Sequence, residues 1–150
     1  MSTTSKSFYA LEPQIILEAV ESLGLRCTGR LLALNSMENR VYEVEIELAA
    51  EAQSRYDSFR VAKFYRPGRW SREQILEEHE FLFQAQAQHL PVVVPLRFLD
   101  EHSLAEFKEL GIYFAVFPKV GGRNLDEFDE RQLTQLGRLI GRLHAVAASQ

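Results

Sequence analysis

The chain has 150 residues, of which 46% are hydrophobic and 25% are charged, and its formal net charge is −4. This composition is typical of one globular domain or of a lobe with a connector, and it argues against a polyanion-binding domain, which would carry a basic excess. Cys27 is the single cysteine, so the chain can form neither an internal disulfide nor a cysteine-rich metal site.

The N-terminal part predicts a flexible segment and then a helix. Residues 1–7 are small and polar and are expected to be flexible. A helix follows, because Pro13 suits a first helical turn and apolar residues recur at helical spacing until Gly24, which is a typical helix stop.

Alternating apolar and polar residues predict three antiparallel strands after this helix. They lie within residues 25–35, 40–48 and 58–65. The polar turn Asn35–Asn39 joins the first two strands, and residues 49–57 are expected to form a loop.

A long helix is predicted from Ser71. Ser71 and Gln74 have the spacing of a capping box, and apolar residues follow on one helical face. Pro91 marks its end, since proline cannot continue a helix.

The last third of the chain predicts two more strands and a final helix. A fourth strand is predicted over Leu96–Leu99, and residues 101–110 are predicted to form a polar loop. The apolar run 111–118 predicts a buried fifth strand. Residues 119–131 read as a turn-rich connector, and apolar residues at helical spacing predict an amphipathic helix over 132–148.

Together these elements predict an α+β fold with a five-stranded antiparallel sheet, one long helix inserted after the third strand, and an N-terminal helix. The expected organisation is a lobe over 8–118, a hinge over 119–131, and a first helix over 132–150. The apolar stripe of that last helix has no predicted partner in the chain, so we expect it to lead into a further lobe that the chain does not include.

Lys63 is the first candidate site residue. It lies in the run Val61–Tyr65, where strand alternation puts Val61, Lys63 and Tyr65 on one face. A lysine among apolar residues loses hydration unless its ammonium meets an anion, and ATP phosphates are held by such a lysine. The alternative is a surface lysine whose stem covers the sheet edge.

An acid that orients this lysine should come from the following helix. Glu77, Glu78 and Glu80 are the candidates. Glu78 is preferred and Glu77 is second, because Glu78 lies three residues after Ile75 and four before Leu82, next to the apolar stripe. The alternative is a solvated helix face.

Two further segments fit a nucleotide site. The turn over 35–40 can cradle phosphate without glycine, since Asn and Ser tolerate tight backbone, although most polar turns are only turns. The apolar run 114–122 ends in Pro-Lys-Val-Gly-Gly, which has the form of an adenine-binding strand end with a hinge.

Four ordered motifs resemble the stress response kinase A family, which are bacterial serine/threonine protein kinases of the aminoglycoside phosphotransferase and choline kinase type. The motifs are ALNSMENRVYEV, VAKFYRPGRWSREQILEEHEF, PVVVPL and YFAVFPKVGGRNL. The resemblance implies the N-terminal lobe of a kinase-like fold, ATP with Mg2+ as cosubstrate, protein Ser/Thr hydroxyls as acceptors, and a monomer that serves in stress survival when complete.

The resemblance also implies roles for individual residues. Lys63 would hold the α- and β-phosphates and pair with Glu78. The adenine would be flanked by Val41 and Val61 and hydrogen-bonded by the backbone of Phe117 and Lys119. The nucleotide-binding turn would consist of Ser36, Met37, Glu38 and Asn39.

One departure from the family concerns catalysis. The family's His-x-Asp segment has no match, since none of the four histidines is followed two residues later by Asp. Asp126 and Asp129 lie in the connector and form no magnesium motif. The chain is therefore predicted to be a fragment that does not transfer phosphate alone, with no metal ligands of its own.

Two alternatives remain open. A freestanding nucleotide- or partner-binding regulatory module would need to cover the last helix with its own sheet or a dimer. A nucleic-acid binder is suggested by basic and aromatic residues interleaved over 59–70, but the net acidity counts against it. Neither a signal peptide nor a membrane-spanning run is visible, so a cytoplasmic protein without membrane or nucleic-acid partners is expected.

Overall fold

The computed structural model describes residues 8, 11–48, 54–98, 100–122 and 127–149, so the predicted flexible segment 1–7 lies outside the described residues. A five-stranded sheet in the order β1-β2-β3-β5-β4, with every neighbouring pair antiparallel, is its central feature. The strands are β1 (Cys27–Leu34), β2 (Arg40–Ile46), β3 (Phe59–Phe64), β4 (Ala105–Phe107) and β5 (Ile112–Pro118). The helical elements are α2 (Pro13–Glu21), the 3-10 helix η1 (Arg55–Ser58), α3 (Arg72–Ala87) and α4 (Glu130–Ala148).

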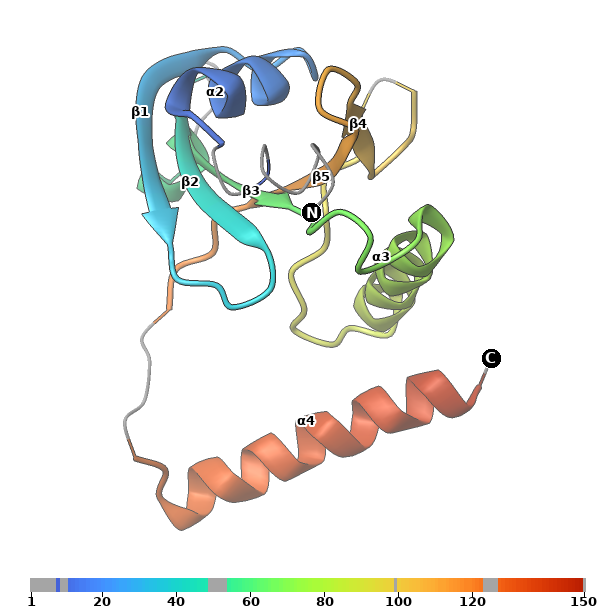
Figure 1. Cartoon of the computed structure of the whole chain (residues 1–150). Coiled ribbons are helices and arrows are strands. Elements are labelled where there is room, and N and C mark those ends of the chain that lie inside the picture. The colour runs from blue at the N-terminus through green and yellow to red at the C-terminus, as the bar shows by residue number, and fades with distance from the viewer. Residues whose placement is uncertain (1–7, 9–10, 49–53, 99, 123–126, 150) are drawn as a thin grey trace.

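One face of the sheet forms the main core, and α2 covers it (Figure 1). Ile16 and Val20 of α2 pack against residues that alternate along the central strands. These sheet residues are Tyr42, Val44, Ala62, Phe64, Phe114 and Val116. Gly24 follows the helix with φ +85°, a conformation that favours glycine, and so ends α2 where the sequence predicts.

The opposite face of the sheet carries a smaller core next to α3. Tyr65 and Ala115 pack there against Ile75 of α3 and Leu104. The predicted capping box of α3 is confirmed, because the Gln74 N–H donates to Ser71 Oγ at 3.3 Å and the Ser71 N–H donates to Gln74 Oε1 at 2.9 Å. The helix beside β3 and β5 therefore begins at a fixed point.

The fourth strand is not where the sequence predicts it. Residues 91–98 form no strand, Leu99 lies outside the described residues, and β4 forms instead within the predicted polar loop. The segment before it contributes one sheet-like contact, from the Leu96 N–H to Val116 O at 2.8 Å. β4 is a three-residue edge strand with an exposed glutamate, so its sequence resembles that of a loop. Gly111, at φ +61°, lies in the turn that connects β4 to β5.

The last helix begins at Glu130, two residues before its predicted start, because Asp129 caps it by accepting from the Gln132 N–H at 2.7 Å. Its C-terminal half packs on α3, where Val146 is buried with Ala85. Its N-terminal half leaves an apolar stripe exposed, which consists of Leu133, Leu136 and Ile140. Figure 1 shows α4 away from the strands. Within the described ranges, no helix has the length and apolarity needed to cross a bilayer.

Candidate nucleotide-binding site

Lys63 and Glu78 meet on the face of the sheet that α2 does not cover. The Lys63 Nζ lies 2.9 Å from Glu78 Oε1, and the two side chains are 22% and 48% exposed. Lys63 comes from the centre of the sheet on β3, and Glu78 comes from α3. Of the acids proposed from the sequence, Glu78 is the one that contacts Lys63, as the helical spacing predicts.

The aromatic ring of Tyr65 supports the same lysine. The Lys63 Nζ lies 4.6 Å from the Tyr65 ring centroid, a geometry in which the ring quadrupole attracts the ammonium. Tyr65 itself is buried at the start of the turn that follows β3. The lysine head is therefore held between a carboxylate and an aromatic face while part of it stays open to solvent.

Strand register places the other predicted site residues around Lys63. Val41 of β2 and Ala115 of β5 lie directly opposite Lys63 on its two neighbouring strands. In the next row on the same face, Val61 lies between Glu43 and Phe117. Val41 and Val61 are thus diagonal neighbours on an open apolar patch, and Phe117 lies at its border. The sequence anticipated this grouping but not the presence of Glu43 within it.

The turn between β1 and β2 lies beside the end of β3. Asn39 Oδ1 accepts from the Arg66 N–H at 3.3 Å, and Ser36 Oγ accepts from the Asn39 N–H at 3.3 Å. The Glu38 carboxylate lies within 3.7 Å of the guanidinium groups of Arg66 and Arg69. Met37 is fully exposed. The turn is therefore attached to the segment after β3. Strand β2 begins directly after the turn, and its residue Val41 lies opposite Lys63.

The connector after β5 is attached to the lobe through side chains. The Lys119 ammonium pairs with the Glu43 carboxylate on β2, and it also lies 5.1 Å from the Phe59 ring centroid. Tyr56 of η1 lies against the backbone of Gly121. Sequence reasoning assigned only a backbone role to Lys119. The alternation of VYEVEIEL puts Glu43 on the same face as Val41, but it does not indicate that Lys119 reaches that face.

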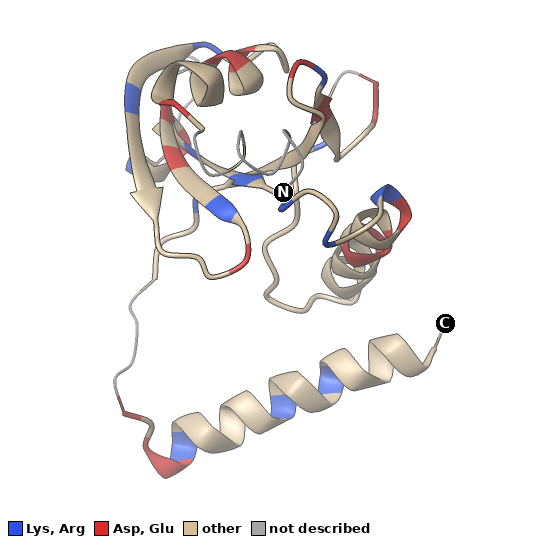
Figure 2. Cartoon of the chain, in the orientation of Figure 1, with Lys and Arg blue, Asp and Glu red and all other residues tan. Residues whose placement is uncertain are grey.

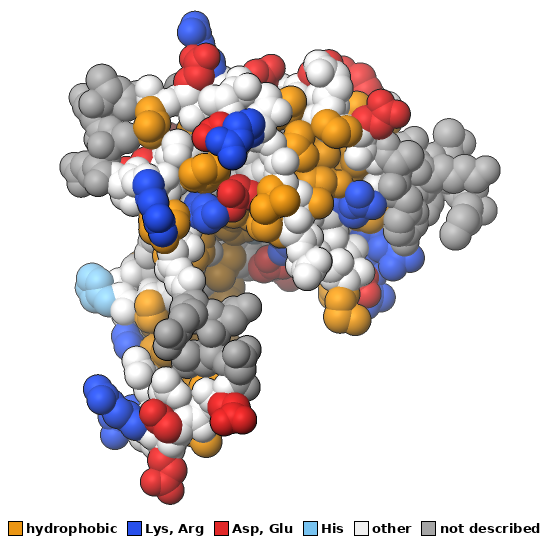
Figure 3. Space-filling model, turned by 90° about the vertical axis from the view of Figure 1, so that its left-hand side faces the viewer, with side chains coloured by type: hydrophobic (Ala, Val, Ile, Leu, Met, Phe, Trp, Pro, Cys, Tyr) orange, Lys and Arg blue, Asp and Glu red, His pale blue; other side chains and the backbone are white. Residues whose placement is uncertain are grey.

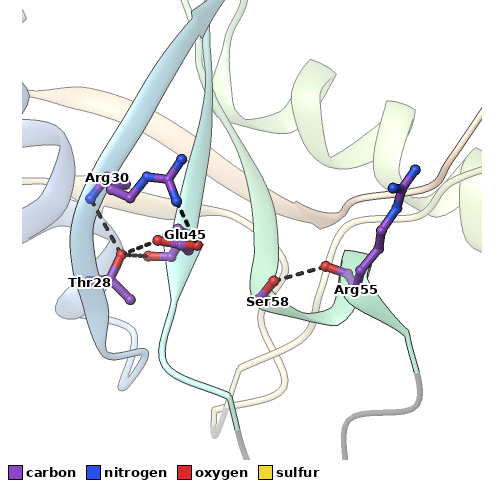
Figure 4. A network of polar contacts seen from close by, with 5 residues as sticks. All are labelled: Thr28, Arg30, Glu45, Arg55 and Ser58. Carbon is purple, nitrogen blue, oxygen red and sulfur yellow. Dashed lines mark hydrogen bonds and ion pairs between the residues drawn. The ribbon is translucent and has the colours of Figure 1, made fainter.

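The outer part of this face is acidic but internally paired. Thr28 Oγ1 donates to Glu45 Oε2 at 2.7 Å, and Arg30 lies 3.4 Å from Glu45 Oε1 (Figure 4). Arg30 and Glu45 line a shallow pocket with Leu32 and Glu43. Viewed from the β1 side, hydrophobic side chains lie among acidic and basic ones over this region (Figure 3).

Charge is therefore unevenly distributed along the site face. Glu43 and Glu45 lie toward the outer ends of the strands, whereas Lys63 lies near the β1–β2 turn. Figure 2 shows the basic positions of β3 between acidic positions on β2 and on α3. Each of these three groups has an ion-pair partner of opposite charge: Lys119 for Glu43, Arg30 for Glu45 and Glu78 for Lys63.

The structure also shows how the acidic side chains and the interleaved basic and aromatic residues are arranged. Among the residues that the structure describes, no three His, Cys, Asp or Glu side chains group together as metal ligands. Of the interleaved basic and aromatic residues, Phe64 is buried, and Lys63 and Arg69 pair with carboxylates.

A five-stranded sheet with a lysine–glutamate pair between its third strand and the following helix defines a kinase-like N-terminal lobe. The chain belongs to the phosphotransferase enzyme family, whose model matches residues 31–150. Stress response kinase A of Escherichia coli (strain K12) and of Shigella flexneri are each 39% identical to it over 150 residues. The resemblance found in the sequence motifs is confirmed.

The chain spans less than half the length of these curated relatives. The match covers 100% of this chain and 42% of each of the two proteins. Serine/threonine protein kinase RdoA of Salmonella typhimurium (strain LT2) is 38% identical over 144 residues, with 96% of this chain and 40% of that protein covered.

A solved structure confirms the fold class. Amicoumacin kinase hAmiN, solved in complex with AMP-PNP, Ca2+ and Ami, superposes with a TM-score of 0.73. The match covers 97% of this chain and 42% of that chain at 21% sequence identity, so it shows the fold alone.

Proposed function

We propose that this chain is the ATP-binding N-terminal lobe of a cytoplasmic serine/threonine protein kinase of the stress-response type. The observation that carries the proposal is the contact of 2.9 Å between Lys63 Nζ and Glu78 Oε1. A lysine on the third strand, oriented by a glutamate on the next helix, holds the phosphates of ATP in kinase-like enzymes. The Lys63 side chain is 22% exposed, so part of it is accessible to such a ligand.

The surroundings of the pair support one orientation of the nucleotide. The phosphates would lie at Lys63 and the β1–β2 turn, where Ser36 and Asn39 offer polar groups. The adenine would lie against Val41 and Val61, and the backbone of Phe117 and Lys119 would bind its edge. In the reverse orientation the phosphates would lie away from the Lys63 ammonium.

The acceptor and the cation are proposed from the relatives and from the solved structure. Protein Ser/Thr hydroxyls are proposed as acceptors because one relative is named a serine/threonine protein kinase. A divalent cation is proposed because the amicoumacin kinase structure contains a nucleotide analogue and Ca2+. Mg2+ would neutralise phosphate charge during transfer, but its ligand set does not occur among the described residues. The chain alone is therefore expected to bind ATP without transferring its phosphate.

Equilibrium titration with a fluorescent ATP analogue tests the proposal directly. The 150-residue chain should bind the analogue, and Lys63→Ala should weaken binding by about tenfold to a hundredfold, as expected for the loss of one charge-assisted contact. Lys108→Ala is the matched control, because Lys108 is an exposed lysine near β4. Equal affinity of the Lys63→Ala chain and the wild-type chain, with both folded, would remove the basis of the proposal.

A freestanding regulatory module remains the second candidate. It requires the chain's own sheet or a dimer to cover the apolar stripe of α4. In the described residues α3 covers only the Val146 end, while Leu133, Leu136 and Ile140 are exposed. Sedimentation of the chain tests this candidate, since a stable dimer that protects Leu133 from solvent would favour it.

A further inference from the structure

Three polar side chains are joined in the small core beside the Lys63–Glu78 pair. His79 of α3 is 1% exposed, and both of its ring nitrogens have a partner. Its Nε2 lies 2.9 Å from Tyr65 Oη, and its Nδ1 lies 2.9 Å from Ser103 Oγ. Because each partner is a hydroxyl, which can donate or accept, both contacts are satisfied in either neutral tautomer.

This group, Tyr65–His79–Ser103, connects three separate segments. Tyr65 follows β3, His79 belongs to α3, and Ser103 precedes β4. Burial lowers the pKa of His79 to about 4, so the ring is neutral near pH 7 and bridges two hydroxyls without an uncompensated charge. A buried polar group that is fully satisfied favours one arrangement of its neighbours over others.

The group borders the candidate nucleotide site in two places, on α3 and at the end of β3. Glu78 directly precedes His79 in α3, and Tyr65 is the residue whose ring lies under the Lys63 ammonium. Successive residues on a helix point about 100° apart, so the direction of one fixes the direction of the next. With His79 fixed inward by two hydrogen bonds, Glu78 is directed toward β3.

The Lys63–Glu78 contact is not strong enough to orient the helix by itself. Glu78 is about half exposed, and ion pairs between exposed groups contribute little, because solvent screens them and both side chains lose freedom. We propose that His79, held by Tyr65 and Ser103, is a positioning residue that fixes the rotation of α3 and so brings Glu78 to Lys63. This role rests on the proposed nucleotide-binding function of Lys63.

The first test measures the lysine–glutamate pair without any nucleotide. The rate at which a limiting acylating reagent modifies Lys63 is followed by peptide mass spectrometry in the 150-residue chain. Glu78→Gln sets the rate for a broken pair, which is faster because the Lys63 amine is no longer held in contact with the carboxylate and can reach the reagent more often. Tyr65→Phe and Ser103→Ala each remove one hydroxyl and keep the packing, and both should shift the rate toward that of Glu78→Gln.

A second variant series separates positioning from general loosening. His79→Leu should give the largest increase in rate, and His79→Gln, whose amide reaches the position of Nε2, should partly restore the wild-type rate. Val44→Ala is the control, because Val44 is buried in the core on the opposite face of the sheet. Wild-type rates in all folded variants of Tyr65, His79 and Ser103 would overturn the inference. An equal increase in Val44→Ala would overturn it as well.

Nucleotide titration of the same variants tells this inference apart from the proposed function. In one outcome, His79→Leu speeds Lys63 modification, while His79→Leu and Lys63→Ala both leave ATP affinity unchanged. The positioning role of His79 then stands, and the nucleotide site does not. If Lys63→Ala abolishes binding while His79→Leu alters neither readout, the nucleotide site stands and the positioning role does not. The expected result is a change in both readouts, with wild-type behaviour in the control.

Discussion

The ring of Tyr56 lies so close to the backbone of Gly121 that a Cβ added at position 121 would be 2.6 Å from the ring atom Cε2. Tyr56 belongs to η1, and Gly121 belongs to the connector after β5. The contact therefore holds the connector against the lobe, next to the Lys119–Glu43 ion pair. Two contacts of different chemistry, one steric and one ionic, fix the start of the segment that leads to α4.

Gly121→Ala should consequently destabilise the chain, because either the ring or the connector must move. The expected loss is below about 1 kcal/mol in the free energy of unfolding, because the atoms met are at the end of the Tyr56 side chain, and denaturant titration measures it. Gly122→Ala is the matched control, since nothing lies within 4 Å of a Cβ at that position. Combining Gly121→Ala with Tyr56→Ala should recover part of the loss. Equal effects at positions 121 and 122 would contradict the close contact.

Glu78→Gln should weaken binding of an ATP analogue more than Glu77→Gln does. Glu78 contacts Lys63, whereas Glu77 is an exposed residue on the same helix and provides a matched control. We expect about a tenfold loss for Glu78→Gln, equivalent to about 1.4 kcal/mol, and less than a twofold loss for Glu77→Gln. Titration of both variants checks this, and the reverse order would assign the partner of Lys63 to the neighbouring glutamate.

Local patterns in the sequence were sufficient to predict the Lys63–Glu78 contact. Strand alternation gave the face of Lys63, and helical spacing put Glu78 beside the apolar stripe of α3. The ion pair of Glu43 with Lys119 was not predictable in this way, because its residues lie 76 positions apart. It depends on the sheet order, which places β3 between β2 and β5.

The sequence was least informative where elements are short. β4 has three residues and an exposed Glu106, so alternation had too few positions to be recognised. The hydrogen bonds of His79 were missed for another reason. Tyr65 and Ser103 are brought to His79 only by the folded arrangement of three segments.

The two halves of α4 should respond differently to substitution. Val146 is 1% exposed and packs against α3, whereas Ile140 is 44% exposed. Val146→Ala should lower the free energy of unfolding by about 2 kcal/mol through lost burial and a residual cavity. Ile140→Ala should change it by less than about 0.5 kcal/mol. Thermal or denaturant unfolding of both variants decides the matter, and an equal loss would mean that the Ile140 half is also covered in solution.

His79 should make stability depend on pH in the mildly acidic range. Burial lowers its pKa from the ordinary value of 6.5 to about 4 in the folded chain. Between these values the unfolded chain binds more protons at this position than the folded chain does, so stability falls as the pH decreases from 6.5 to 4. The full difference corresponds to a penalty of about 3 kcal/mol, which is absent above pH 6.5 and complete below pH 4.

Denaturant unfolding at pH 7 and at pH 4.5 measures this effect. His79→Gln should lower stability at pH 7, because it replaces a buried ring, yet it should lose less stability between the two pH values than the wild-type chain does. His144→Gln is the control, since His144 is exposed on α4 and its replacement should leave the pH profile nearly unchanged. A wild-type pH profile in His79→Gln would mean that other groups cause the acid sensitivity and that His79 is not buried as a neutral ring.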